Sequence, residues 1–335
     1  MTIRVPDPDT CSGPEGRGPR FLARGEVVQD TLTGLVWTRS ANPLGFPVAW
    51  QDALDAVAEM NRAGFLGFAD WRLPNRRELR SLVCHGTRQP ALPPGHPFRD
   101  VFLGWCWTST TKAGQPAYAW NVHLEGGRMF YSRKDEFRLL WPVRGESAVL
   151  PRTGQSACFD AAGLAIPCPG SGQDGELRAG IPWPSPRFER CGQDLLDRLT
   201  GLCWLDPAAL PDQPLTWQEA LDLAAARPGP AGQPWRLPDI NELESLVDAD
   251  RADPALPLEP AAPPLPAALL AEGFWSATTS GFDPAWAFVL YVQKGAVGVG
   301  FKPGRAFLAW PVRRPCAPQA GNEQGPEHPL PQALL

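Results

Sequence analysis

The sequence lacks the features that would assign it at once to a membrane, catalytic or metal-binding class. No stretch approaches 18 consecutive apolar residues, so a membrane-spanning helix is not expected. It contains no phosphate-binding loop, dinucleotide fingerprint, HExxH motif or nucleophile elbow, and we therefore expect no enzyme. The four histidines do not lie at metal-ligand spacing from cysteine. A net charge of −5 argues against general nucleic-acid binding.

Proline, glycine and tryptophan are abundant instead. The 40 prolines and 33 glycines predict short regular elements and many connections. The 14 tryptophans can bury a large area in small cores, whereas tyrosine occurs only three times. Charge is uneven, with a net +4 in residues 1–145 and a net −9 in residues 146–335. The first half is therefore the better candidate for a local cationic surface.

The eight cysteines permit disulfides without proving them. Cys158 and Cys168 flank a short loop containing glycine and proline, and we favour a local disulfide here over free thiols. The N-terminal residues 1–18 are polar and lack the apolar core of a signal peptide. Either the protein is not exported by that route, or a leader has been removed.

An internal repeat dominates the sequence. The motif DTLTGLVW at 30–37 recurs as DRLTGLCW at 197–204, and later motifs recur in the same order at offsets of 164 to 169. The matching motifs are WQDAL and WQEAL, WRLP twice, WTSTT and WSATT, AW at 119–120 and 285–286, and WPVR twice. We predict two copies of one domain, at 19–145 (repeat 1) and 186–314 (repeat 2). The predicted remainder is a flexible N-terminal segment 1–18, a Gly/Pro-rich linker 146–185 and a Pro-rich tail 315–335.

Each repeat is predicted to be α+β, with two helices and a small, mostly antiparallel sheet. Apolar residues between Trp50 and Met60 have helical spacing, and so do those of 217–226. A second helix follows WRLP in each copy, with capping boxes from Asn75 and Glu78 and from Asp239 and Glu242. Strands are expected before the first helix and over 106–144.

These motifs, in this order and present twice, resemble the C-terminal domain family of the Legionella collagen-like protein. The resemblance covers most of residues 19–314. It implies a bacterial module of the cell envelope, cell surface or secreted fraction, whose role is adhesion through polyanionic glycans. The WRLP pattern also resembles formylglycine-generating enzymes and C-type-lectin-like folds, which implies a lectin-like fold by analogy. The chain lacks the late reactive cysteine pair that such an oxidase needs.

Most of the repeated residues are predicted to be structural. Recurring tryptophans are expected in the core, and Arg72 and Arg236 are expected to pair with Glu78 and Glu242 to fix the WRLP turn. The predicted structural set is Trp37, Trp71, Arg72, Glu78, Trp204, Trp235, Arg236 and Glu242.

Differences between the copies suggest a ligand surface. Repeat 1 has three arginines on its second helix where repeat 2 has Ile240, Asn241 and Glu244. Arginine forks suit sulfate and carboxylate groups, and exposed aromatic side chains, Phe282 among them, can stack on sugars. The predicted ligand-binding residues are Arg76, Arg77, Arg80, His123, Arg128, Tyr131, Arg133, Lys134, Lys302 and Arg305. A solvated charged face remains the alternative for each arginine taken singly.

The predicted function is a non-catalytic binding module that recognises polysaccharide, and preferably anionic glycan. The alternative is a structural or protein-binding module in a surface assembly, or a scaffold that displays ligand-binding loops. No cofactor is expected, although the carboxylates of Gln173–Glu176 leave calcium open. The expected partner is a glycan or a surface protein, and the sequence does not predict an oligomeric state.

Overall fold

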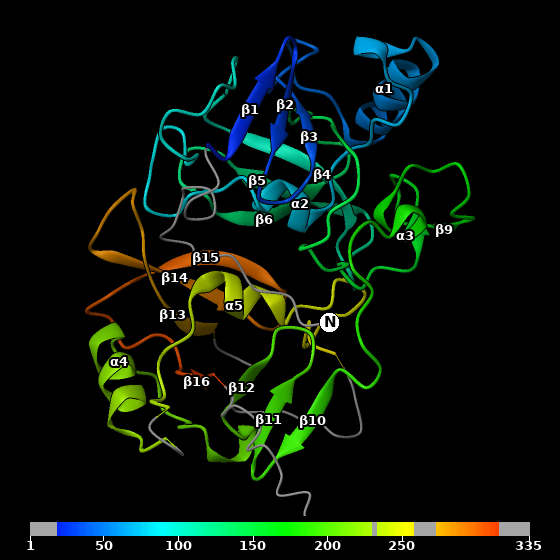
Figure 1. The fold of residues 1–335 in the computed structure, drawn as a ribbon. Helices are drawn as coiled ribbons and strands as arrows, with labels where there is room; N and C mark the ends of the chain where they lie inside the picture. The colour runs from blue at the N-terminus through cyan, green and yellow to red at the C-terminus, as the bar shows by residue number, and fades with distance from the viewer. Residues whose placement is uncertain (1–18, 230–232, 258–272, 315–335) are drawn as a thin grey trace, which may run out of the picture.

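A computed structural model describes residues 19–229, 233–257 and 273–314. Each repeat is α+β, as predicted, and the chain passes from repeat 1 through a folded linker to repeat 2 (Figure 1). Repeat 1 contains β1 (Phe21–Arg24), β2 (Val27–Asp30), β3 (Val36–Thr38), α1 (Trp50–Arg62), the 3-10 turn η1 (Phe65–Gly67), α2 (Arg76–Arg80), β4 (Trp105–Thr111), β5 (Tyr118–His123), β6 (Met129–Arg133) and β7 (Val143–Arg144).

Repeat 2 follows the same order of elements. It contains β10 (Phe188–Cys191), β11 (Asp194–Asp197), β12 (Leu202–Trp204), η2 (Pro207–Ala209), α4 (Trp217–Ala226), α5 (Ile240–Ser245), β13 (Gly273–Thr279), β14 (Trp286–Tyr291), β15 (Ala296–Phe301) and β16 (Val312–Arg313). In both repeats the first three strands form an antiparallel sheet that the last strand completes, in the orders β1-β2-β3-β7 and β10-β11-β12-β16.

The second helix of each repeat is short and is held by its N-terminus. In α2 the Asn75 side chain accepts from the amide of Glu78, and the Glu78 carboxylate accepts from the Asn75 amide. Asp239 and Glu242 form the same reciprocal pair at α5. Both predicted capping boxes are confirmed, and they fix helices too short to be stable alone.

The two repeats share one six-stranded sheet, in the order β13-β14-β15-β6-β5-β4. Its centre is an antiparallel contact between β6 and β15, where Met129 lies opposite Val297. Because these two residues occupy equivalent positions in their repeats, the contact lies on an approximate two-fold axis. The buried core continues across this junction rather than forming two separate centres.

Tryptophan pairs build equivalent parts of both cores. The rings of Trp37 and Trp141 lie edge-to-face at 5.6 Å, and those of Trp204 and Trp310 at 5.5 Å, both with an interplanar angle of 65°. Trp71 and Trp235 are also buried, so the core positions predicted for Trp37, Trp71, Trp204 and Trp235 are confirmed. Arg72 pairs with Glu78 at 2.5 Å and Arg236 with Glu242 at 2.6 Å, as expected for the WRLP turn.

The register of the sheet corrects one detail of the repeat. Ala119 lies opposite Thr111 and Ala287 opposite Thr279, so the two alanines are equivalent. Trp120 therefore corresponds to Phe288, not to Trp286 as the sequence match suggested. Trp286 instead takes the position of Tyr118, near the end of its strand, and is only partly buried.

The linker is folded rather than a simple spacer. It contains the hairpin β8 (Cys158–Phe159) and β9 (Ala165–Ile166), followed by α3 (Asp174–Leu177). Cys158 and Cys168 form the predicted disulfide, with their Cα atoms 5.2 Å apart. The segment carrying α3 and β9 lies against repeat 1 (Figure 1).

Candidate functional site

The arginines predicted to form a cationic face on α2 are not exposed. Arg76, Arg77 and Arg80 are only 1%, 4% and 5% accessible, because α2 packs against repeat 2. All three surround the buried carboxylate of Glu244 on α5, with N–O distances of 3.3, 3.5 and 3.9 Å. Arg77 also donates to the carbonyl of Val247 at 2.7 Å. The prediction that these residues bind ligand is wrong, since they bind the other repeat.

Two predicted lysines lie on tryptophan rings. Lys134 is buried, with its Nζ 3.8 Å from the ring centre of Trp50, and it donates to two linker carbonyls. Burial lowers the pKa of Lys134 to about 7. It is therefore not available to a ligand, which corrects that prediction. Lys302 lies 4.0 Å from the ring centre of Trp217 and is half-buried.

Other predicted residues are accessible but already engaged. Arg133 pairs with Asp135 at 2.8 Å, and Arg305 pairs with Glu219. The His123 ring packs edge-on against another ring, Trp105, at 4.6 Å, and Tyr131 packs on Trp120 at 5.4 Å. The structure does not bring these residues together into one surface, so the expected cationic face of repeat 1 is absent from the described part of the chain.

A cavity of about 480 Å³ opens at the junction of the two repeats. Repeat 1 supplies the turn between β5 and β6 and the first residues of β6, and repeat 2 supplies the loop before β14 and parts of β14 and β15. Its lining residues are Glu125, Gly126, Arg128, Phe130, Ser280, Phe282, Asp283, Trp286, Tyr291, Gly298 and Val299. Cavities of this size with apolar walls and a few polar groups are typical of small-ligand sites.

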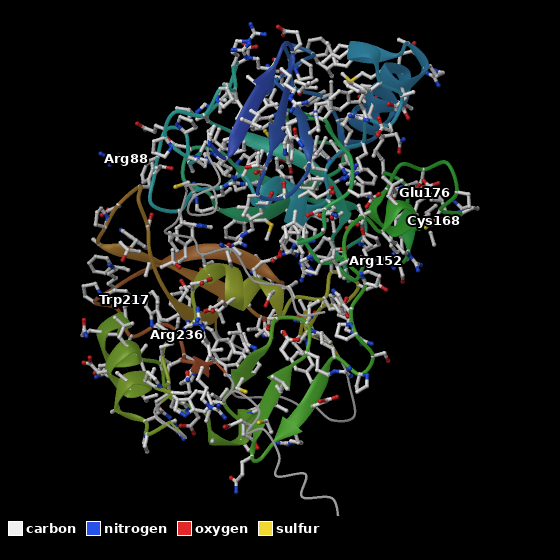
Figure 2. The ribbon with its side chains drawn as sticks, in the orientation of Figure 1. Arg88, Arg152, Cys168, Glu176, Trp217 and Arg236 are labelled. Carbon is white, nitrogen blue, oxygen red and sulfur yellow. A yellow bond between two sulfur atoms is a disulfide. The ribbon has the colours of Figure 1, made fainter. Side chains whose placement is uncertain are left out.

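Backbone contacts between the repeats hold the loop that forms one wall. The amide of Gly281 donates to the carbonyl of His85 at 2.8 Å, and Arg88 donates to the carbonyl of Phe282 at 2.9 Å. Arg88 lies on the repeat 1 side of this junction (Figure 2). A Cβ on Gly281 would lie 2.4 Å from the backbone of Gly86, so only glycine permits this approach. The cavity wall thus depends on both repeats being present.

Four aromatic side chains line the cavity, namely Phe130, Phe282, Trp286 and Tyr291. Of these, Phe282 is 42% exposed. Phe130 and Tyr291 lie 6.3 Å apart at ring centres, one from each repeat. Trp286 is partly buried. Flat apolar faces of this kind match the C–H faces of sugar rings.

The charged groups of the cavity are one cation and two carboxylates. Arg128 is exposed, and its guanidinium has no hydrogen-bond or ion-pair partner within the described residues. Asp283 accepts from the amide of Ala285 at 2.9 Å, which leaves further acceptor capacity. Glu125 accepts from the side chain of Gln89 at 3.3 Å. The cavity therefore offers a planar donor and one acceptor from repeat 1, and a second acceptor from repeat 2.

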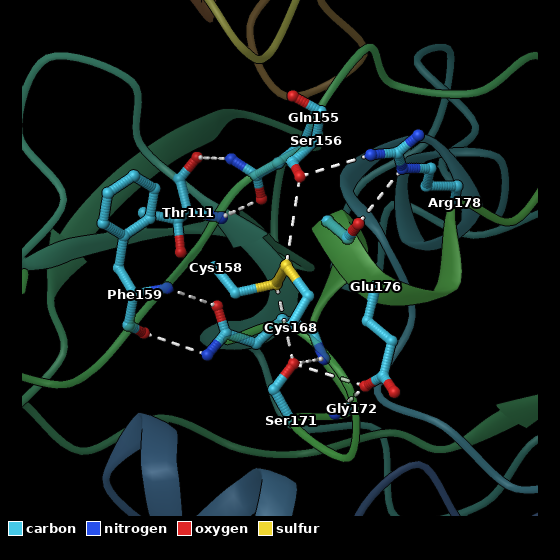
Figure 3. The surroundings of a disulfide bond; sticks show 12 residues. Thr111, Gln155, Ser156, Cys158, Phe159, Cys168, Ser171, Gly172, Glu176 and Arg178 are labelled. Atoms are coloured by element: carbon cyan, nitrogen blue, oxygen red, sulfur yellow. Dashed lines mark hydrogen bonds between the residues drawn. A yellow bond between two sulfur atoms is a disulfide. The ribbon is translucent and has the colours of Figure 1, made fainter. Parts of the chain in front are cut away.

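A second cavity, of about 570 Å³, lies between α1 and the linker, and its carboxylates are largely engaged. Glu176 accepts from the amide of Gly172 and from the hydroxyl of Ser171, beside the disulfide (Figure 3). Asp70 pairs with Arg144 at 2.7 Å. Asp174, considered above with Glu176 for calcium, is buried against two threonine hydroxyls. Across the described residues no group of three or more potential metal ligands gathers.

Comparison with protein families gives two matches in this chain. The model of the Lcl C-terminal domain family matches residues 26–144 and 193–313. The chain belongs to this family. Its two Lcl C-terminal domains in tandem indicate a surface or binding module. A search of curated proteins finds no match.

The cavity lies between the two Lcl C-terminal domains, so neither domain alone forms it. No helix within the described ranges is long and apolar enough to cross a membrane. Among the residues that line the cavity, Arg128 and Phe282 were named from the sequence as candidates for ligand binding, whereas Trp286 was placed in the core. The missed signal was its position at the start of a strand, next to a loop that carries exposed Phe282 and Asp283.

Proposed function

We propose that this protein is a non-catalytic carbohydrate-binding module that holds a short stretch of glycan in the cavity between its repeats. The observation that carries the proposal is the combination of partly exposed aromatic rings with an unpaired guanidinium and two carboxylates in one cavity of about 480 Å³. Aromatic faces supply contact area, and a few charged groups orient the hydroxyl groups of the sugar.

The charges favour a sugar with one carboxylate over a densely sulfated polymer. Arg128 can bind a carboxylate through two parallel N–H bonds. Glu125 and Asp283 accept from sugar hydroxyls but repel further negative charge. The arginines that would have extended a polyanion site are buried against Glu244. We therefore expect a uronic-acid-type residue to be preferred to a neutral sugar, and heparin-like polymers to bind weakly.

We expect this glycan binding to serve adhesion at the cell surface. The disulfide between Cys158 and Cys168 supports an oxidising location outside the cytosol, such as the periplasm, cell surface or secreted fraction. Adhesion requires only that the module binds the glycan, so no catalytic reaction on the glycan is needed.

A glycan array on the full chain, with uronic-acid-containing, neutral and sulfated oligosaccharides, tests this proposal. We expect Phe282→Ala to weaken binding of all ligands. Arg128→Ala should weaken binding of carboxylated sugars by about tenfold, equivalent to about 1.4 kcal/mol, and so remove the preference for them. Phe137→Ala and Arg133→Ala are matched controls, since Phe137 is 63% exposed and Arg133 is paired with Asp135, both outside the cavity.

Binding that is unchanged in both cavity variants would contradict the site. An array without any glycan hit would contradict the function and favour the alternative of a protein-binding or structural module. Tight binding of heparin that survives Arg128→Ala would show that the polyanion is bound elsewhere on the chain.

A further inference from the structure

The linker covers a specific face of repeat 1, and it does so with side-chain amide and backbone carbonyl groups. The Gln155 amide accepts from the Thr111 N–H and donates to the Thr111 carbonyl, both at 2.8 Å (Figure 3). Thr111 ends β4, which is an edge strand of the six-stranded sheet. Gln155 thus satisfies the strand edge as a neighbouring strand would.

The same segment also satisfies the buried lysine of repeat 1. Lys134 donates to the carbonyls of Phe159 at 3.0 Å and Asp160 at 3.1 Å while its ammonium lies over Trp50. As a result Trp50, Thr111 and Lys134 are all at most 1% accessible.

Repeat 2 has the same surface without that cover. Trp217, Thr279 and Lys302 occupy the positions of Trp50, Thr111 and Lys134, and all three are partly exposed. Ala277 is exposed where its equivalent, Ser109, is buried. Trp217 lies at the start of α4 on the outer side of repeat 2 (Figure 2). We call Trp217, Ala277, Thr279 and Lys302 the open face.

The polar groups of the open face are arranged like their equivalents in repeat 1, except that they lack the hydrogen bonds that the linker makes there. Lys302 keeps its position over the tryptophan ring, but its Nζ donates to the Thr279 hydroxyl at 2.8 Å instead of to two carbonyls. Thr279 ends β13, the other edge strand of the sheet. Within the described ranges, no side-chain amide lies against the Thr279 peptide group.

We propose that the open face binds an extended peptide segment of a partner protein. The segment presents a glutamine or asparagine side chain to the Thr279 peptide group and two backbone carbonyls to Lys302. Repeat 1 shows that this chemistry covers the same surface completely, and a strand edge is a template for added polypeptide. The proposal is independent of the sugar cavity, which shares none of these four residues.

A disulfide-closed synthetic peptide of residues 152–171 is a suitable probe. It carries Gln155, Phe159 and Asp160 but ends before Asp174, whose buried carboxylate accepts from the Thr110 and Thr153 hydroxyls in the native linker. The native linker occupies the equivalent face of repeat 1, so added peptide has access to repeat 2 only. We expect saturable binding to the full chain, measured by fluorescence anisotropy, and slower acetylation of Lys302, measured by mass spectrometry.

Matched variants separate this site from nonspecific attachment. The Gln155→Ala peptide should bind about tenfold more weakly, since two hydrogen bonds are lost. Lys302→Met in the protein should weaken binding by a similar factor, whereas Lys294→Met, at an exposed lysine of the same repeat, should not.

Three results would overturn the proposal. The first is no binding of the wild-type peptide, and the second is equal binding of the Gln155→Ala peptide. The third is a Lys302 that is already protected in the full chain and becomes reactive in a chain ending at Arg314, because the chain's own tail would then be the occupant.

Discussion

Replacing Glu244 by glutamine should destabilise the junction between the repeats more than any exposed charge change. The Glu244 carboxylate is the anion shared by Arg76, Arg77 and Arg80, and all four side chains are at most 6% accessible. Burial lowers the pKa of each of the three guanidinium groups, and the Glu244 charge opposes that shift. Without this carboxylate three buried cations lose their shared counter-charge. Removing one partner of a buried ion pair costs roughly 3–5 kcal/mol, and we expect a loss in that range.

Urea denaturation of the full chain, followed by tryptophan fluorescence, measures this loss. Glu59→Gln is the matched control, because Glu59 pairs with Arg62 on the surface, where both side chains are at least 65% exposed. That variant should lose at most about 0.5 kcal/mol. If repeat 2 separates before repeat 1 unfolds, Glu244→Gln will also split the transition in two.

A second substitution distinguishes lost charge balance from lost packing. Arg80 has the fewest polar contacts of the three arginines, the nearest being His85 at 3.4 Å. Adding Arg80→Met to Glu244→Gln should therefore recover part of the stability. Equal losses for Glu244→Gln and Glu59→Gln, or a further loss in the double variant, would refute the view that charge compensation holds this junction together.

Two further predictions concern buried carboxylates in the linker and in the two repeats. Burial raises the pKa of Asp174 from 3.8 to about 6, against the opposing effect of the hydroxyl donors Thr110 and Thr153. The folded state therefore holds this proton more tightly than the unfolded state. The free energy of unfolding should fall by up to ~3 kcal/mol as pH rises from about 4 to about 6. Asp174→Asn should flatten this part of the plot of urea midpoint against pH, and an unchanged plot would contradict the prediction. Glu78→Gln should cost about 2–3 kcal/mol and Glu242→Gln about 1 kcal/mol, because Arg72 is 12% exposed and Arg236 is 43% exposed. Thermal melts at pH 7 compare the two variants, and equal losses would show that exposure does not control these pairs.

The repeated motifs were sufficient to predict the elements of the fold. Capping boxes, the helical stripe of α1 and the ion pairs after WRLP depend on residues close together in the chain, so their spacing contains the necessary information. The order of elements and the disulfide followed in the same way. The shared sheet did not, because the contact of Met129 with Val297 involves two strands that carry no signal of their eventual neighbour.

The site was predictable only in part for the same reason. Arg128 and Phe282, which line the cavity, were named from the sequence because arginine and aromatic residues in loops suggest binding. Arg76, Arg77 and Arg80 share that chemistry, yet α2 turns them toward Glu244, 164 residues beyond Arg80 in the sequence. Composition alone cannot distinguish an unpaired arginine that can bind a ligand from one that forms an ion pair with a carboxylate of another domain.

The Arg80–Glu244 contact explains why the repeats differ at this position. The two residues are equivalent in their repeats and face each other near the two-fold axis marked by Met129 and Val297. In a symmetric pair of identical repeats this position meets its own copy, so either two arginines or two glutamates would be buried together. Only a pair with different residues can place opposite charges there. The arrangement therefore favours pairing of repeat 1 with repeat 2 over pairing of either repeat with itself, and it keeps the cavity between the repeats, which needs both, within one chain.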